Sequence, residues 1–90
     1  MDLVPLKTPM DDAMLAKLAD VFREVFANES LSISRGTTAS DIKGWDSLAH
    51  IRLMLSVQRA FRVRLSAGET SQLSNVGALL ELLRRKQERS

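Results

Sequence analysis

The segment that decides the fold is Gly44-Trp45-Asp46-Ser47-Leu48-Ala49-His50-Ile51, which ends a long polar stretch and opens a periodic one. Asp46 or Ser47 begins a predicted helix that reaches Phe61, because both residues favour the N-cap and no Gly or Pro interrupts the segment. One apolar arc of this helix holds Leu53, Met54, Val57 and Phe61. A second, separate arc holds Leu48, Ile51 and Leu55. A small core covers only one arc well, so we expect the second to contact something else.

Upstream of this segment, a helix is predicted from Pro9 to Ala27, with Thr8 as its N-cap and Asn28 near its C-cap. Its apolar stripe consists of Met14, Leu15, Leu18, Val21, Phe22, Val25 and Phe26. Residues 28–45 show no periodicity and are rich in Ser, Thr and Gly, which predicts a long loop. Loops of this length inside a compact domain tend to be functional. We expect Leu31, Ile33 and Ile42 to hold the loop against the core.

Downstream, Ser66 and Glu69 have the spacing of a capping box, which predicts a short third helix to about Leu73. A fourth helix follows Ser74 or Asn75, and its stripe consists of Val76, Leu79, Leu80 and Leu83. The predicted fold is all-α: a four-helix bundle with three longer helices, a short third one, and a long loop between the first two. Residues 1–8 are expected to form a flexible lead-in, 9–86 the bundle and 87–90 a frayed tail.

Composition limits what the chain can do. It has 90 residues, no cysteine and one histidine, His50, so a disulfide, a cysteine nucleophile and a thiolate metal site are excluded. We therefore predict no catalytic residue, no metal site and no enzymatic activity. The N-terminus lacks a basic leader with an apolar stretch, and no segment approaches a membrane span. We expect a cytoplasmic monomer.

Charge is unevenly distributed along the chain. Residues 1–46 contain five basic and eight acidic residues, whereas residues 47–90 contain eight basic and three acidic residues. The second half is therefore electropositive, which leaves both nucleic acid and an acidic protein open as partners.

Ser47 is the residue that can carry chemistry. A serine at the first turn of a helix is exposed, and a phosphate ester there lies near free backbone N–H groups at the positive end of the helix dipole. The segment 44–51, followed by Phe61 and Val63-Arg64-Leu65, resembles the acyl carrier proteins over residues 10–84. The resemblance implies that Ser47 is the attachment point for 4′-phosphopantetheine, transferred from coenzyme A by a Mg²⁺-dependent holo-acyl-carrier-protein synthase or phosphopantetheinyl transferase.

The same resemblance implies a non-enzymatic carrier that holds acyl or aminoacyl intermediates as thioesters. Its further partners would be a loading ligase and a downstream transferase or synthase. Asp46 is expected either to cap the helix or to take part in recognition by the holo synthase. Trp45 is expected to anchor the loop, and His50 to flank the core or lie near the prosthetic phosphate.

The charge of the second helix departs from the family pattern. Positions that are typically acidic in carriers of fatty-acid synthesis hold Ala49, Arg52, Gln58 and Arg59. This favours a carrier of a dedicated pathway, docking through Leu48, Ile51, Arg52, Leu55 and Arg59. The alternative is a small basic helical nucleic-acid-binding domain that uses Arg52, Arg59, Arg62, Arg64 and the basic C-terminal tail, although its second helix lacks polar base-reading residues.

Overall fold

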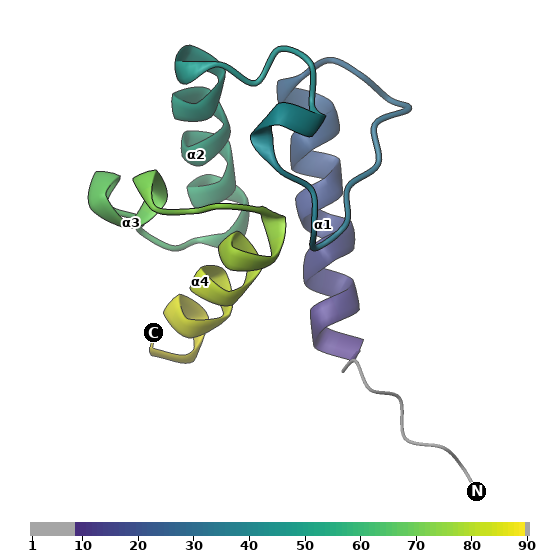
Figure 1. Cartoon of the computed structure of the whole chain (residues 1–90). Helices are drawn as coiled ribbons and strands as arrows, with labels where there is room; N and C mark the ends of the chain where they lie inside the picture. Colours follow the sequence, from purple (N-terminus) through teal and green to yellow (C-terminus); the bar gives the residue numbers. More distant parts are fainter. Residues whose placement is uncertain (1–8, 90) are drawn as a thin grey trace, which may run out of the picture.

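The computed structural model describes residues 9–89, with the side chains of residues 13–88. Over this range the chain is all-helical: α1 (Pro9–Val25), the one-turn 3₁₀ helix η1 (Ala39–Asp41), α2 (Ser47–Phe61), α3 (Ala67–Ser71) and α4 (Val76–Arg89). α1 and α2 lie side by side and antiparallel, while α4 crosses near the C-terminal end of α2 (Figure 1). The expected all-α bundle with a short third helix is confirmed. The lead-in over residues 1–8, including the Thr8 cap, lies outside the described residues.

The core forms where the predicted stripes of the three longer helices meet. Its fully enclosed side chains are Leu18, Phe22, Leu53, Val57, Val76, Leu79 and Leu83. Ile42 reaches this core from the long loop, and Leu31 and Ile33 pack against its edge, as expected. Burial of these apolar side chains supplies most of the stabilisation of a domain this small.

The end of α1 corrects a predicted boundary. We expected the helix to extend to Ala27, but it ends at Val25 because Ala27 adopts a left-handed conformation, with φ of 50°. The N–H of Asn28 donates to the carbonyl of Arg23 at 3.0 Å, and the N–H of Ala27 to Glu24 at 3.3 Å. This Schellman arrangement satisfies the last carbonyls, yet no glycine marks it in the sequence.

The long loop is attached to α4 by backbone hydrogen bonds. The N–H of Val76 donates to the carbonyl of Thr37 at 2.8 Å, and the N–H of Gly77 to that of Arg35 at 2.7 Å. A Cβ at Gly77 would lie 3.0 Å from the Arg35 oxygen, a contact so tight that the loop would have to shift to accommodate a side chain. The Arg35 guanidinium also contacts the Glu81 carboxylate at 3.1 Å. We call these contacts the loop–α4 clasp.

The two C-terminal helices begin at the predicted caps. In α3, Ser66 Oγ accepts from the N–H of Glu69 at 3.1 Å while Glu69 Oε1 accepts from the N–H of Ser66 at 3.0 Å. α3 ends at Ser71 rather than Leu73. Asn75, not Ser74, caps α4, since its Oδ1 accepts from the N–H of Ala78 at 2.8 Å. No helix within residues 9–89 is long and apolar enough to span a membrane.

The C-terminal boundary also differs from the expectation. α4 continues as helix to Arg89, through residues that we expected to fray. Ion pairs hold its last turns: Arg84 contacts Glu88 at 3.2 Å, and Lys86 contacts Glu69 of α3 at 2.9 Å. These ion pairs stabilise the last turns of α4.

Candidate functional site

Ser47 is the first residue of α2, and its side chain is exposed. Asp46 precedes it as the N-cap: its Oδ1 accepts from the N–H of Ala49 at 2.8 Å. Of the two roles predicted for Asp46, capping is therefore the one that the structure shows. None of the residues in the described part of the chain hydrogen-bonds the Ser47 hydroxyl. The result is a free hydroxyl at the positive end of a 15-residue helix.

A tight turn delivers the chain to this position. Gly44 has φ of 91°, a conformation that L side chains rarely adopt. The N–H of Trp45 donates to the carbonyl of Ile42 at 3.3 Å, and the N–H of Asp46 to that of Gly44 at 3.0 Å. Because Ile42 is buried, the turn is fixed to the core just before Ser47.

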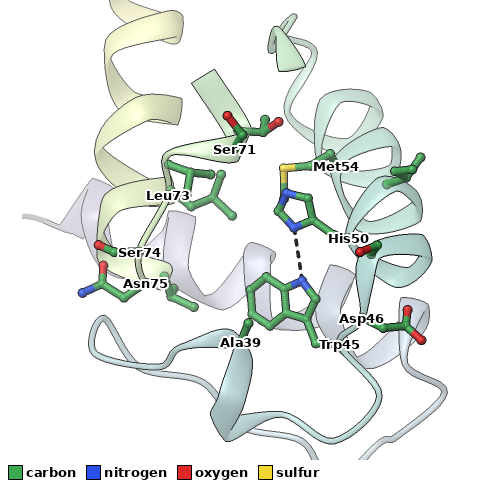
Figure 2. A pocket seen from close by; sticks show the side chains of 14 residues that line it. Ala39, Trp45, Asp46, His50, Met54, Ser71, Leu73, Ser74 and Asn75 are labelled. Carbon is green, nitrogen blue, oxygen red and sulfur yellow. Dashed lines mark hydrogen bonds between the residues drawn. The ribbon is translucent and has the colours of Figure 1, made fainter. Parts of the chain in front are cut away.

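Trp45 and His50 flank Ser47 and contact each other. The indole Nε1–H of Trp45 donates to His50 Nδ1 at 3.1 Å (Figure 2). The Trp45 ring also packs edge-on against Phe22, with 5.4 Å between centroids, and lies 6.1 Å from Phe26. Trp45 thus anchors the loop on α1 and α2, as expected. His50 is half-buried at the flank of the core, with its Nδ1 engaged.

A cleft of about 520 Å³ opens beside Ser47. Its first wall is formed by α2 and the turn before it, and its second wall by α3 and the segment that leads into α4 (Figure 2). Apolar atoms come from Trp45, Ile51, Met54, Leu73, Val76 and Leu79, and polar ones from His50, Thr70, Ser71, Ser74 and Asn75. This second wall was not predicted, because no local sequence pattern relates residues 70–79 to Ser47.

The predicted second arc of α2 is exposed. Leu48, Ile51 and Leu55 are 65%, 57% and 54% accessible. They are the exposed large apolar side chains of the described surface. Arg52 and Arg59 are exposed on the same side of the helix. All five point away from the arc that contains Leu53, Met54, Val57 and Phe61, which is buried. The structure therefore brings the five predicted docking residues onto one face that begins next to Ser47.

Titratable groups with perturbed pKa values lie away from Ser47. The backbone N–H of Ser66, together with Lys86, lowers the pKa of Glu69 from 4.5 to about 2. Arg84 and Arg35 lower the pKa of Glu81. Glu69 links α3 to α4 through Lys86, and Glu81 links α4 to the long loop through Arg35. Within the described residues, no group of three or more His, Asp or Glu side chains is placed to bind a metal ion.

Comparison with known proteins identifies the fold. No protein-family model matches the chain, and no curated protein matches it. The solution NMR structure of the holo acyl carrier protein from Geobacter metallireducens aligns with a TM-score of 0.77 and 38% sequence identity, over 91% of this chain and 90% of that one. The chain belongs to the acyl carrier protein family.

Acyl carrier proteins are carriers rather than catalysts, which agrees with the predicted absence of enzymatic activity. The alignment extends over 91% of the chain, so the carrier role applies to the bundle as a whole. This role, and not nucleic-acid binding, is what family membership supports. The Geobacter metallireducens protein is described as a holo form.

Proposed function

We propose that Ser47 carries 4′-phosphopantetheine and that the chain holds acyl or aminoacyl intermediates as thioesters on this arm. The observation that supports it best is the free Ser47 hydroxyl at the start of α2, between a capping carboxylate and an exposed apolar arc. An attachment point must be accessible to another enzyme, and this hydroxyl is. The cleft beside it has room for part of the arm or its cargo.

Attachment requires a separate transferase, with coenzyme A as the donor. A bond forms between Ser47 Oγ and the phosphorus next to pantetheine, and the pyrophosphate bond of coenzyme A breaks. Adenosine 3′,5′-bisphosphate leaves with the electron pair, and the hydroxyl proton passes to a base of the transferase. The chain itself supplies the nucleophile and the helix N-terminus, whose N–H groups favour the new phosphate.

Partner enzymes are proposed to dock on Leu48, Ile51, Arg52, Leu55 and Arg59. These side chains lie next to Ser47 and are exposed. The partners would be the phosphopantetheinyl transferase, a loading ligase, and a downstream transferase or synthase of a dedicated pathway. We propose that the carrier acts as a cytoplasmic monomer.

Intact mass measurement tests the attachment. The apo protein is incubated with coenzyme A, Mg²⁺ and a broad-specificity phosphopantetheinyl transferase, and we expect the mass to increase by one phosphopantetheine. The Ser47→Ala variant should remain unmodified. Ser74→Ala is the matched control, because Ser74 is also exposed and lines the same cleft. Modification of Ser47→Ala, or peptide mapping of the group to another serine, would contradict the proposal.

A further inference from the structure

Positive charge is concentrated in one segment of the carrier. Residues 47–66 contain four arginines, Arg52, Arg59, Arg62 and Arg64, and no aspartate or glutamate. None of the four forms an ion pair with another residue in the described range, and all four are exposed. Several cations elsewhere are paired with carboxylates, as in Arg23–Asp20, Arg35–Glu81 and Lys86–Glu69, whereas residues 47–66 gather four that are unpaired in the described part of the chain into a single segment. The four arginines, here called the arginine strip, are therefore available to an external anion.

The segment that carries the last two arginines is held firmly in place. Arg62 ends α2 in a left-handed conformation, with φ of 57°, and the N–H of Val63 returns to the carbonyl of Gln58 at 3.2 Å. The Gln58 side chain accepts from the N–H of Leu65 at 2.9 Å and donates to the carbonyl of Met54 at 3.2 Å. Ordering this segment costs a partner little, because the loop is already fixed before binding.

Two residues of the arginine strip, Arg52 and Arg59, share their face of α2 with the apolar arc. At 100° per residue they fall with Leu48, Ile51 and Leu55 within a stripe about 100° wide, and Arg62 and Arg64 follow in the segment after the helix. Along the helix axis Arg59 lies about 18 Å beyond Ser47. Apolar contacts thus dominate near the attachment point, whereas charge dominates at the far end of the helix.

We propose that the arginine strip docks onto an acidic surface of the enzymes that act on the arm. This inference rests on the proposed function and names the chemistry of its partners. A nucleic-acid backbone would leave Leu48, Ile51 and Leu55 uncovered on the same face, whereas a protein surface covers both apolar and basic groups. The acidic residues of such an enzyme would lie about 18 Å from the entrance to its active site, matching the distance from Ser47 to Arg59.

A charge-exchange experiment tests this proposal. The probe is a phosphopantetheinyl transferase with a carboxylate-rich carrier-binding surface, together with a variant of it in which those carboxylates are replaced by lysine. We expect kcat/KM for loading the wild-type carrier to be about tenfold or more higher with the acidic enzyme at low salt. Arg59→Glu/Arg62→Glu lowers the charge of the strip from +4 to 0 and should abolish this preference, as should high salt.

The matched control is Lys43→Glu/Arg85→Glu, which changes net charge equally at two exposed cations outside the strip. It should retain the wild-type preference. The fold of each variant is checked by its melting temperature. Arg59→Gln/Arg62→Gln, which should weaken the preference, serves if the glutamate variant does not fold.

Three results would overturn the proposal. The first two are equal loading of the carrier by both enzymes and equal effects of the test and control variants. The third is arginine-dependent binding of a 20-base-pair DNA duplex or of anionic vesicles, without any preference between the two enzymes. Absence of modification at Ser47 with every enzyme would instead contradict the carrier function itself.

Discussion

The indole Nε1–H of Trp45 donates a 3.1 Å hydrogen bond to Nδ1 of His50, and the two rings are nearly parallel, with 17° between their planes. One residue precedes the α2 cap and the other lies in the first turn of the helix. The bond therefore spans Ser47 and fixes the entry of the loop relative to the helix. Because Trp45 also packs on Phe22, the same contact connects the Ser47 region to α1.

A double-mutant cycle measures this contact. Trp45→Phe removes the donor but keeps an aromatic ring, and His50→Leu removes the acceptor. In urea unfolding we expect a coupling free energy of about 1 kcal/mol between the two changes, typical of one hydrogen bond with some ring contact. If the two losses add without coupling, the bond does not contribute to stability.

Asp46 and Ser47 should respond differently to alanine. Asp46→Ala removes the side chain that caps α2 and should destabilise the protein by about 1 kcal/mol. Ser47→Ala removes a hydroxyl without a partner in the described structure and should change stability by less than about 0.5 kcal/mol. The Asp46→Asn variant, which keeps the capping oxygen, should retain a stability close to that of the wild type. A larger loss for Ser47→Ala in thermal or urea unfolding would mean that the serine caps the helix.

The two faces of α2 predict opposite effects of a carboxylate. Leu53 is fully buried, so Leu53→Asp places a charge in the core without a partner and should unfold much of the protein, at a cost of several kcal/mol. Leu55 is 54% accessible, so Leu55→Asp should leave the melting temperature nearly unchanged and reduce turnover by partner enzymes. Similar melting temperatures for the two variants would contradict this assignment of faces.

Gly77 should be intolerant of a methyl group. In Gly77→Ala the new Cβ would meet the Arg35 carbonyl at 3.0 Å, so the loop must shift and weaken the 2.7 Å bond. We expect a loss of about 1–2 kcal/mol, the cost of overpacking less the gain in helix propensity. Gly68→Ala is the control, since nothing lies within 4 Å of its Cβ, and it should be neutral or slightly stabilising. Equal unfolding midpoints for the two variants would show that the loop–α4 clasp is loose.

Glu69 should make the stability of the folded state depend on pH in the acidic range. Its pKa falls from 4.5 to about 2 on folding, so its ionised form stabilises the folded state fully above pH 4.5, and this contribution disappears as the pH drops toward 2. Glu69→Gln keeps a hydrogen-bonding group without the charge. The difference in melting temperature between wild type and variant should be constant at neutral pH and vanish near pH 2. A difference that does not vary with pH would exclude this role.

Local patterns predicted the parts of the structure that depend on local physics. The 3.6-residue spacing of apolar residues located the helices, and the capping residues Asp46, Ser66 and Asn75 located their starts. The exposed arc that contains Leu55 followed from the same spacing, because a helix with two apolar sides in a small domain cannot bury both.

Features built from distant residues were not predictable in this way. The loop–α4 clasp depends on backbone atoms of Arg35 and Thr37, which carry no side-chain signal. The end of α1 at Val25 depends on the left-handed conformation of Ala27, which sequence patterns assign to glycine or asparagine. The wall of the cleft opposite Ser47 exists only once α3 is packed beside α2.

The loop–α4 clasp also bears on the order in which the chain folds. Its two backbone bonds connect positions about forty residues apart, whereas each helix forms contacts within a few residues. Closing such a long segment is entropically costly and tends to follow the assembly of local structure. We expect the clasp to form after the transition state, so that weakening it accelerates unfolding while refolding keeps its rate. The clasp then sets how long the folded carrier persists, not how fast it forms.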